Sequence, residues 1–257
     1  GFQFTYFEKA FGKLFAGECN KVYGDEFTQN DDYVTGIGNN VTLEFENMDF
    51  SQLVQDYART HPEKVMEIPH VTAGVYGADS ARVVELTFVY QNSRDALRQM
   101  QAQVQPVFNA AALYVSGDGA QRQKYSQLYA FLMERFDYSL ETSITPAYSL
   151  LRHGVGDAKA FAVVYAAMCQ EAGLDCRVVS GTRWGEQWYW NMVLDEGVYY
   201  HVDLLRSNEV GAFHEWTDAD MEALFEIAMN NSQVRYILGD PDVKAFYTKL
   251  LEGQQQL

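Results

Sequence analysis

The chain has 257 residues and a formal net charge of −16 at pH 7. Its apolar fraction of 47% is ordinary for a globular protein, and the 14% of aromatic residues supply a sizeable core. So acidic a chain disfavours binding to the phosphate backbone of nucleic acids and to anionic membrane surfaces. The longest apolar run, 160–169, is far shorter than the roughly 20 residues needed to span a membrane.

Both helices and strands are expected over the first 140 residues. The expected helices cover 1–16, 49–60, 95–116 and 120–138, with an interruption of the third at Pro106. The expected strands cover 41–45, 71–76 and 82–90. Phenylalanines give the first helix an aromatic stripe, which we expect to pack against the rest of the protein. The mixture predicts an N-terminal α+β region, 1–140, packed on a second domain, 141–257.

The stretch from His153 to Arg206 carries the clearest pattern. Turn-forming residues at 154–157 precede a helix over 158–172, whose apolar residues recur at the spacing of a buried helical face. Gly173 ends this helix. Strands at 176–181, 188–194 and 198–204 follow, and the last two are joined by a tight turn at 195–197. The unit is therefore one helix followed by an antiparallel meander, and two further helices are expected, at 217–229 and from 240 to about 251.

Five short motifs occur in a fixed order along this stretch. They are Phe161-Ala162, Ala172-Gly173-Leu174, Val179-Ser180-Gly181, Trp190-Asn191 and Tyr199-Tyr200-His201-Val202-Asp203. In order and spacing they resemble the transglutaminase-like superfamily, which shares the papain-like thiol fold. The resemblance implies an α+β fold with a transglutaminase-like core. It also implies a Cys-His-Asp catalytic triad at positions 158, 188 and 203.

Two of these three positions hold residues that cannot perform the family's chemistry. Thiol catalysis needs a sulfur nucleophile, an imidazole that activates it and a carboxylate that orients the imidazole. Ala158 has no nucleophilic atom, and the indole of Trp188 is a hydrogen-bond donor without a basic nitrogen. Only Asp203 is of the family's type. We therefore expect the family's catalytic route to be lost.

The candidate binding residues at the old cleft are Trp184, Trp188, Trp190, Asn191, His201 and Asp203. Residues two apart on a strand face the same way, so His201 and Asp203 share one face. One interpretation is an aromatic groove with a carboxylate and an imidazole at its base. The other is that Trp188 fills the volume of the lost thiol and imidazole, with Asp203 bonded to backbone or to the Trp188 N–H.

The three cysteines, Cys19, Cys169 and Cys176, are odd in number, and no pair has metal-ligand spacing. We expect no disulfide framework, metal or cofactor, and we expect Cys169 and Cys176 to be small buried hydrophobic residues. Cys169 lies about 16 Å along the helix from position 158, which disfavours it as a relocated nucleophile.

Three function classes are compatible with these observations. The preferred one is a catalytically inactive binding or scaffold module for peptide, glycan or cell-wall material at the old cleft. The alternatives are a hydrolase that uses Asp203 and His201 as an acid–base pair with water, and a purely structural interaction domain. The first residue, Gly1, is compatible with a tag remnant or a removed export signal. Together with the resemblance, it leads us to expect a bacterial protein that is secreted or attached to the cell surface.

Overall fold

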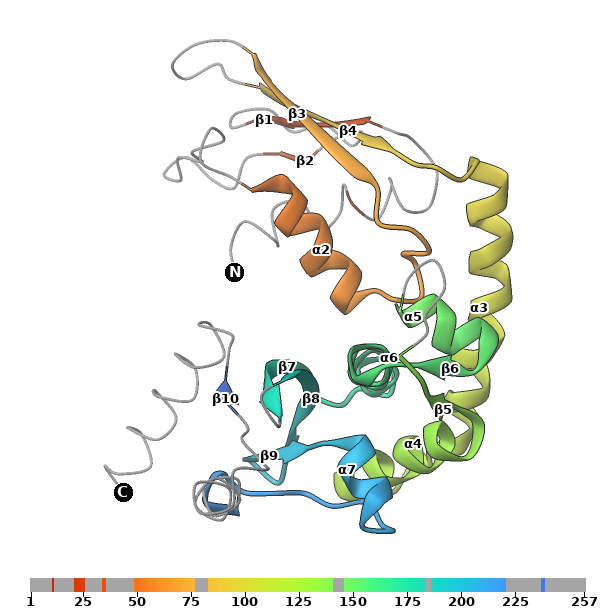
Figure 1. Cartoon of the computed structure of the whole chain (residues 1–257), viewed down its shortest axis with the longest axis vertical. Helices are drawn as coiled ribbons and strands as arrows, with labels where there is room; N and C mark the ends of the chain where they lie inside the picture. Colours follow the sequence, from red (N-terminus) through yellow and green to blue (C-terminus); the bar gives the residue numbers. More distant parts are fainter. Residues whose placement is uncertain are drawn as a thin grey trace. The chain divides into compact units, whose positions relative to one another are not determined.

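The computed structural model describes residues 11, 21–25, 34–35, 49–76, 83–140, 146–183, 186–220 and 237–238. Contacts divide the chain into two compact units, 1–106 and 107–257, whereas the sequence placed a boundary near residue 140 (Figure 1). Several expectations lie outside the described residues: most of the aromatic stripe of 1–16, Cys19, the strand 41–45, Trp184 and the helices beyond residue 220.

The first unit contains a four-stranded sheet and a helix. The strands are β1 (Lys21–Asp25), β2 (Val34–Thr35), β3 (His70–Tyr76) and β4 (Val83–Val89), in the order β2-β1-β4-β3. Helix α2 (Phe50–Thr60) begins at Asp49, whose side chain accepts a hydrogen bond from the Gln52 backbone N–H. The buried Phe11 ring contacts Tyr57 of α2 and Phe88 of β4, which joins the two layers through aromatic packing.

Helix α3 (Arg94–Tyr114) runs without a break through Pro106, so the expected interruption is wrong. A proline inside a helix removes one backbone donor and leaves a carbonyl without its usual partner. Here the proline lies on the exposed side, where water can hydrate that carbonyl, while Val104 and Phe108 keep the apolar side of the helix buried.

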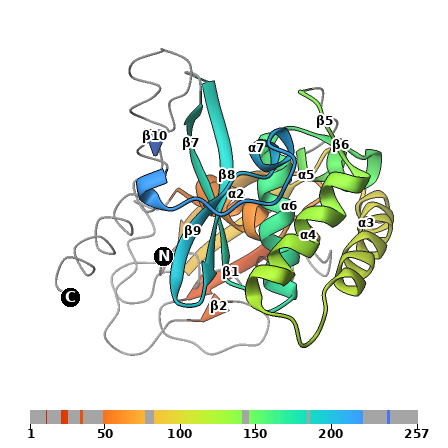
Figure 2. The same ribbon diagram turned by 90° about the horizontal axis from the view of Figure 1, so that it is seen from below.

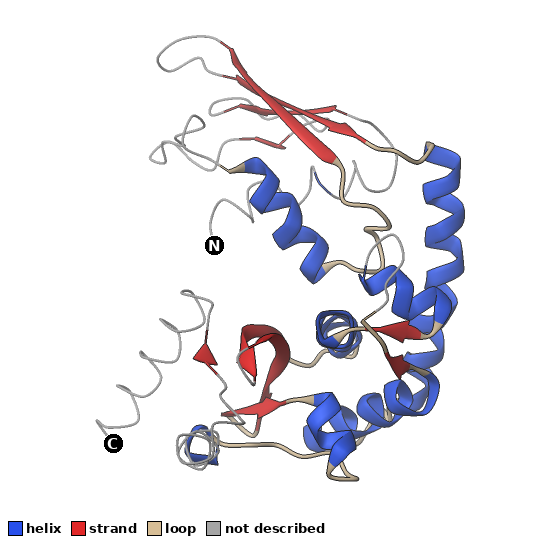
Figure 3. Cartoon of the chain, in the orientation of Figure 1, coloured by secondary structure: helices blue, strands red, loops and turns tan. Residues whose placement is uncertain are grey.

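The second unit is built around helix α6 (Ala158–Glu171), whose residues are buried from 160 to 169. The sheet beside it has the order β10-β7-β8-β9, with strands β7 (Cys176–Arg183), β8 (Glu186–Asp195), β9 (Val198–Val202) and β10 (Ile237–Leu238). Helix α4 (Gln121–Arg135) packs on α6, and α6 packs on β7 and β8 (Figure 2). The predicted α+β class is confirmed, and Figure 3 shows the layers by element type.

Turns and close approaches in this unit depend on particular residues. Glu196 and Gly197, with φ of 48° and 81°, form the hairpin turn between β8 and β9. Gly156 lies where an added Cβ would be 2.8 Å from the Ala160 Cβ, so only glycine lets the chain pass there. Gly173, with φ of 75°, ends α6 as predicted.

Several short elements differ from the expected ones. The helix expected over 120–138 ends at Arg135, and β5 (Asp137–Tyr138) pairs in parallel with β6 (Val155–Gly156). The strand expected over 198–204 ends at Val202, because the Asp203 side chain caps α7 (Leu204–Glu209) instead. Helix α5 (Pro146–Tyr148) continues into one π-helical turn, η3 (Ser149–His153). None of the helices in the described ranges is long and apolar enough to cross a membrane.

Candidate functional site

Position 158 is the first residue of α6. Asp157 caps this helix, since its Oδ1 accepts a hydrogen bond of 2.9 Å from the Ala160 backbone N–H. Ala158 is 6% exposed. The next residue, Lys159, places its Nζ 5.4 Å from the ring centroid of Tyr189. The first turn of α6 therefore lies beside the segment of β8 that carries Trp188.

Trp188 and Asp203 are joined by a direct hydrogen bond. The Trp188 Nε1–H donates to Asp203 Oδ2 at 2.9 Å. The other carboxylate oxygen, Oδ1, accepts from the Arg206 backbone N–H at 3.1 Å and so caps α7. Asp203 is buried and Trp188 is half-buried. Both oxygens of the carboxylate are therefore engaged, one by backbone and one by the indole.

A buried arginine that the sequence analysis did not single out completes this arrangement. Arg183 Nη1 lies 3.6 Å from Asp203 Oδ2, and Nη2 donates to Glu209 Oε2 at 2.8 Å. Its Cζ lies 4.8 Å from the centroid of the Trp188 ring, which is a cation–π contact. Gly181 pairs with Trp188, and Arg183 is two residues beyond Gly181 on the same face of β7. The alternation of residues between the two faces of β7 is the sequence signal that would have identified Arg183.

An exposed aromatic edge borders these buried groups. The Tyr138 ring centroid is 6.0 Å from that of Trp188, and Tyr138 is 46% exposed. Burial raises the pKa of the Tyr138 hydroxyl, the charges of Asp157 and Glu186 raise it further, and Arg183 opposes them. The hydroxyl therefore stays protonated at neutral pH. We call Tyr138 and Trp188 together the aromatic rim.

His201 is held by partners other than Asp203. The Trp190 Nε1–H donates to His201 Nδ1 at 3.0 Å, which makes this nitrogen an acceptor. His201 Nε2 lies 2.9 Å from Asp218 Oδ1 and donates to it. The backbone of His201 also pairs with Trp216 in both directions. The buried imidazole is thus engaged at both nitrogens, by Trp190 of β8 and by Asp218 in the segment after α7.

Asn191 connects the central helix to the sheet. Its Nδ2 donates to the carbonyl of Ala162 at 2.8 Å and to the carbonyl of Arg177 at 3.3 Å. The side chain is fully buried. Of the predicted set, Asn191 and the His201–Trp190 pair are therefore internal, whereas Trp188 reaches the surface.

The two described cysteines are free thiols buried at the far end of α6 and the start of β7. Burial raises the pKa of Cys176 well above its usual value, and its contact with Cys169 raises it further. A protonated, inaccessible thiol is a poor nucleophile. Within the described ranges, no group of three or more His, Cys, Asp or Glu side chains could hold a metal ion.

The family comparison agrees with the fold around α6. Residues 109–224 match the model of the transglutaminase-like superfamily. This part of the chain, which includes α6 and the strands β7 to β9, belongs to the transglutaminase-like superfamily. No curated protein matches the chain.

Solved structures resemble the chain only distantly. A TGase aligns at 10% identity and a TM-score of 0.37, covering 57% of this chain and 46% of the TGase. A candidate protease from Parabacteroides distasonis aligns at 12% identity and a TM-score of 0.32, covering 51% of this chain and 35% of the protease. A candidate cysteine protease from Cytophaga hutchinsonii aligns at 12% identity and a TM-score of 0.35, covering 59% of this chain and 68% of the protease. The chain spans less than half the length of the first two, so function is argued below from its own residues.

Proposed function

We propose that the second unit is a transglutaminase-like domain without thiol catalysis that serves as a binding or scaffold module. One observation carries the proposal: the Trp188 Nε1–H donates to Asp203 Oδ2 at 2.9 Å. The family resemblance implies a histidine–aspartate hydrogen bond between these two positions. An indole in this place keeps the carboxylate bonded but supplies no base.

The remaining groups of the site support the same proposal. Ala158 offers no nucleophile at the start of α6. Asp203 has both oxygens bonded and faces the guanidinium of Arg183, so it is held as a structural anion. His201, the partner in the alternative hydrolase, bonds to Trp190 and Asp218. The contacts therefore favour a structural role over acid–base chemistry for this pair.

The binding half of the proposal rests on the aromatic rim. Exposed aromatic rings provide flat apolar faces, and the nearby polar groups of Asp157 and Glu186 can hydrogen-bond to a ligand. Peptides, glycans and cell-wall fragments present matching apolar faces and donors. The secreted or surface location likewise stays a prediction of the resemblance.

Activity assays with restored residues test the catalytic half. The protein, the variant Ala158→Cys and the double variant Ala158→Cys/Trp188→His are incubated with a glutamine-containing peptide and an amine. We expect no turnover by the unmodified protein, and alkylation by iodoacetamide at position 158 only in the variants, faster in the double variant because the imidazole favours the thiolate. Turnover by the unmodified protein that iodoacetamide abolishes would overturn the proposal.

A thermal-shift screen tests the binding half. Soluble peptidoglycan fragments, oligosaccharides and peptides are each added to the unmodified protein and to Tyr138→Ala, with Tyr76→Ala as a matched control because Tyr76 is 59% exposed in the first unit. We expect one ligand class to raise the Tm of the unmodified protein and the control, but not of Tyr138→Ala. An equal shift in all three proteins would contradict binding at the rim, and no shift with any ligand would leave only the scaffold role.

A further inference from the structure

Two of the three cysteines lie together in the core of the second unit. Cys169 is near the C-terminal end of α6 and Cys176 is the first residue of β7, and their side chains are 0% and 1% exposed. Both are free thiols, and the two thiols are in hydrogen-bond contact with each other. An odd number of cysteines in the chain thus still leaves one complete pair.

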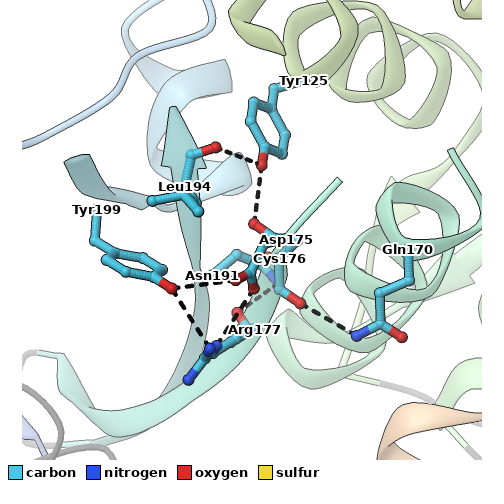
Figure 4. A network of polar contacts seen from close by, with 8 residues as sticks. All are labelled: Tyr125, Gln170, Asp175, Cys176, Arg177, Asn191, Leu194 and Tyr199. Atoms are coloured by element: carbon cyan, nitrogen blue, oxygen red, sulfur yellow. Dashed lines mark hydrogen bonds and ion pairs between the residues drawn. The ribbon is translucent and has the colours of Figure 1, made fainter. Parts of the chain in front are cut away.

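The end of α6 turns the chain back so that the two cysteines meet. Gly173, with φ of 75°, reverses the chain, and the Leu174 backbone N–H donates to the Cys169 carbonyl at 2.9 Å. The Gln170 Nε2 donates to the Cys176 carbonyl at 3.3 Å, as Figure 4 shows. The backbone of each cysteine is therefore fixed by a hydrogen bond within this short turn, and a disulfide requires such closely held positions.

The surroundings of the pair shield it from reagents in solution. The Tyr165 hydroxyl contacts the Cys169 thiol, and the Asn191 side chain contacts the Cys176 thiol. Tyr165 and Asn191 are themselves fully buried. Burial raises the pKa of Cys176 well above its usual value, so this thiol stays protonated at neutral pH. Because the thiolate is the form that attacks a disulfide, the folded and reduced pair should react slowly with an oxidant.

We propose that Cys169 and Cys176 form a disulfide between α6 and β7 when the chain folds in the presence of a disulfide oxidant such as oxidised glutathione. One cysteine thiolate attacks the oxidant, which releases one glutathione thiol and leaves a mixed disulfide on the protein. The other cysteine then attacks the protein sulfur of this mixed disulfide and releases the second glutathione thiol. The cysteines lose two electrons and two protons, and the oxidant takes them up as two thiols.

The redox state set during folding should determine the stability of the second unit. A disulfide at this place restricts the unfolded chain and joins the central helix to the sheet. By linkage, the factor by which the disulfide favours the folded state is the factor by which folding favours the disulfide. Because the folded pair is buried, the chain should keep the redox state in which it folded.

Peptide mapping of refolded protein tests the pairing. The unmodified protein and Cys19→Ser are refolded with oxidised glutathione, treated with N-ethylmaleimide and cleaved with trypsin, which cuts after Lys159 and Arg177. We expect the peptide 160–177 from both proteins to lack two hydrogen atoms and to carry no N-ethylmaleimide. After refolding with reduced glutathione, it should carry N-ethylmaleimide on both cysteines. Glutathione or N-ethylmaleimide on both cysteines after oxidative refolding would overturn the proposal.

A comparison with the unfolded chain shows whether the fold, rather than closeness in sequence, pairs the thiols. Cys19→Ser is brought to equilibrium with mixtures of reduced and oxidised glutathione, either refolded or in denaturing urea. We expect the equilibrium constant for the disulfide to be at least about tenfold larger for the folded chain. Equal constants would mean that the fold does not hold the thiols in the geometry of a disulfide, and the proposal would be wrong.

Thermal unfolding provides a second readout with a matched control. Cys19→Ser refolded under oxidising conditions should have a higher Tm than the same variant refolded under reducing conditions. The variant Cys19→Ser/Cys169→Ala/Cys176→Ala has no thiol, so its Tm should be the same in both. Oxidised glutathione added to folded, reduced Cys19→Ser should react far more slowly than with the unfolded chain. An equal Tm of the two forms of Cys19→Ser, or an equal rate for folded and unfolded chain, would contradict a buried redox pair.

Discussion

A buried carboxylate needs compensating partners. Asp203 accepts hydrogen bonds from the indole of Trp188 and the backbone N–H of Arg206, and it forms an ion pair with Arg183 at 3.6 Å. In a thiol enzyme the same carboxylate would orient an imidazole. Here it caps a helix and neutralises an arginine that is itself buried. Asp203 therefore has a structural role in this fold.

Replacing Trp188 by alanine should destabilise the protein by about 3 kcal/mol, because ring packing, the hydrogen bond to Asp203 and the contact with Arg183 are lost together. Trp188→Phe keeps a ring and should cost about 1 kcal/mol. Urea unfolding measures both, with the exposed Tyr76→Ala as a control that should change stability by less than about 0.5 kcal/mol. A loss below about 1 kcal/mol for Trp188→Ala would show instead that water replaces the ring, as in an open groove.

Glu215 is a second buried carboxylate, and it is less well satisfied. Its Oε1 has no hydrogen-bond partner in the described part of the chain, and Oε2 lies 3.6 Å from the exposed Arg122. Burial raises the pKa of Glu215, Arg122 partly opposes this, and Asp195 adds to it. The charged form is thus disfavoured in the folded state relative to the unfolded one.

Glu215→Gln should therefore stabilise the protein by about 1 kcal/mol at neutral pH, since it removes a buried charge with an unsatisfied oxygen. The sign follows from linkage: a carboxyl with a raised folded pKa costs stability above that pKa, and the cost disappears as the pH falls to the ordinary value of 4.5. Melting curves at several pH values measure the difference. A gain that persists unchanged at the acid end would contradict burial of the charge as its cause.

At the scale of elements, local signals explain what could be predicted. The elements that lie close to their expected ranges are helix α2, the antiparallel pair β3 and β4, helix α6 and the meander β7 to β9. Each of them has its own periodicity in the sequence. The short pair β5 and β6 and the turn η3 have only two to five residues and no such period. The β5–β6 pair joins Asp137 to Val155, a contact that no local pattern records, and η3 is a single irregular turn that continues α5.

The first turn of α6 depends on its cap. Asp157→Ala removes the acceptor for the Ala160 N–H and should destabilise the protein by about 1 kcal/mol, while Asp157→Asn retains an acceptor and should cost only a few tenths. Urea unfolding of both variants provides the comparison. Equal losses would indicate that the charge of Asp157, rather than its hydrogen bond, stabilises the helix.

At the scale of the whole chain, the sequence indicated the superfamily, and the resemblance predicted that 158 and 188 are triad positions. It did not indicate which residues contact Trp188. Tyr138 lies 50 residues before Trp188 in the sequence, and only the tertiary structure brings it to the Trp188 ring. Arg183 lies on the neighbouring strand β7, and its contact with the ring depends on the register of β7 with β8. The continuity of α3 through Pro106 likewise depends on which side of the helix faces water. The motifs indicated where the site residues lie in the sequence. The side chains that contact each of them could be identified only from the tertiary structure.

The layers of the second unit are joined by one buried tyrosine. The Tyr125 hydroxyl on α4 lies 2.8 Å from the carbonyl oxygen of Asp175 and 2.9 Å from that of Leu194, and shares its proton between them (Figure 4). The Tyr165 hydroxyl on α6 donates in turn to the backbone carbonyl of Tyr125 at 2.9 Å. Burial raises the pKa of Tyr125, so its hydroxyl remains a donor over the whole neutral range. Tyr125 thus connects α4 to α6 and to the sheet of the second unit.

Tyr125→Phe should cost about 1–2 kcal/mol of unfolding free energy, because it leaves the Leu194 carbonyl without this donor. The Asp175 carbonyl keeps the Leu194 N–H as a second donor, so the loss should not exceed that of one buried acceptor. Tyr199→Phe is the matched control: its hydroxyl also donates to Asp175, at Oδ2, but the residue is half-buried and water can take its place. Urea unfolding of the two variants should differ by about 1 kcal/mol. Equal effects would show that the layers are held by apolar packing around α6, and that the hydroxyl of Tyr125 adds nothing to it.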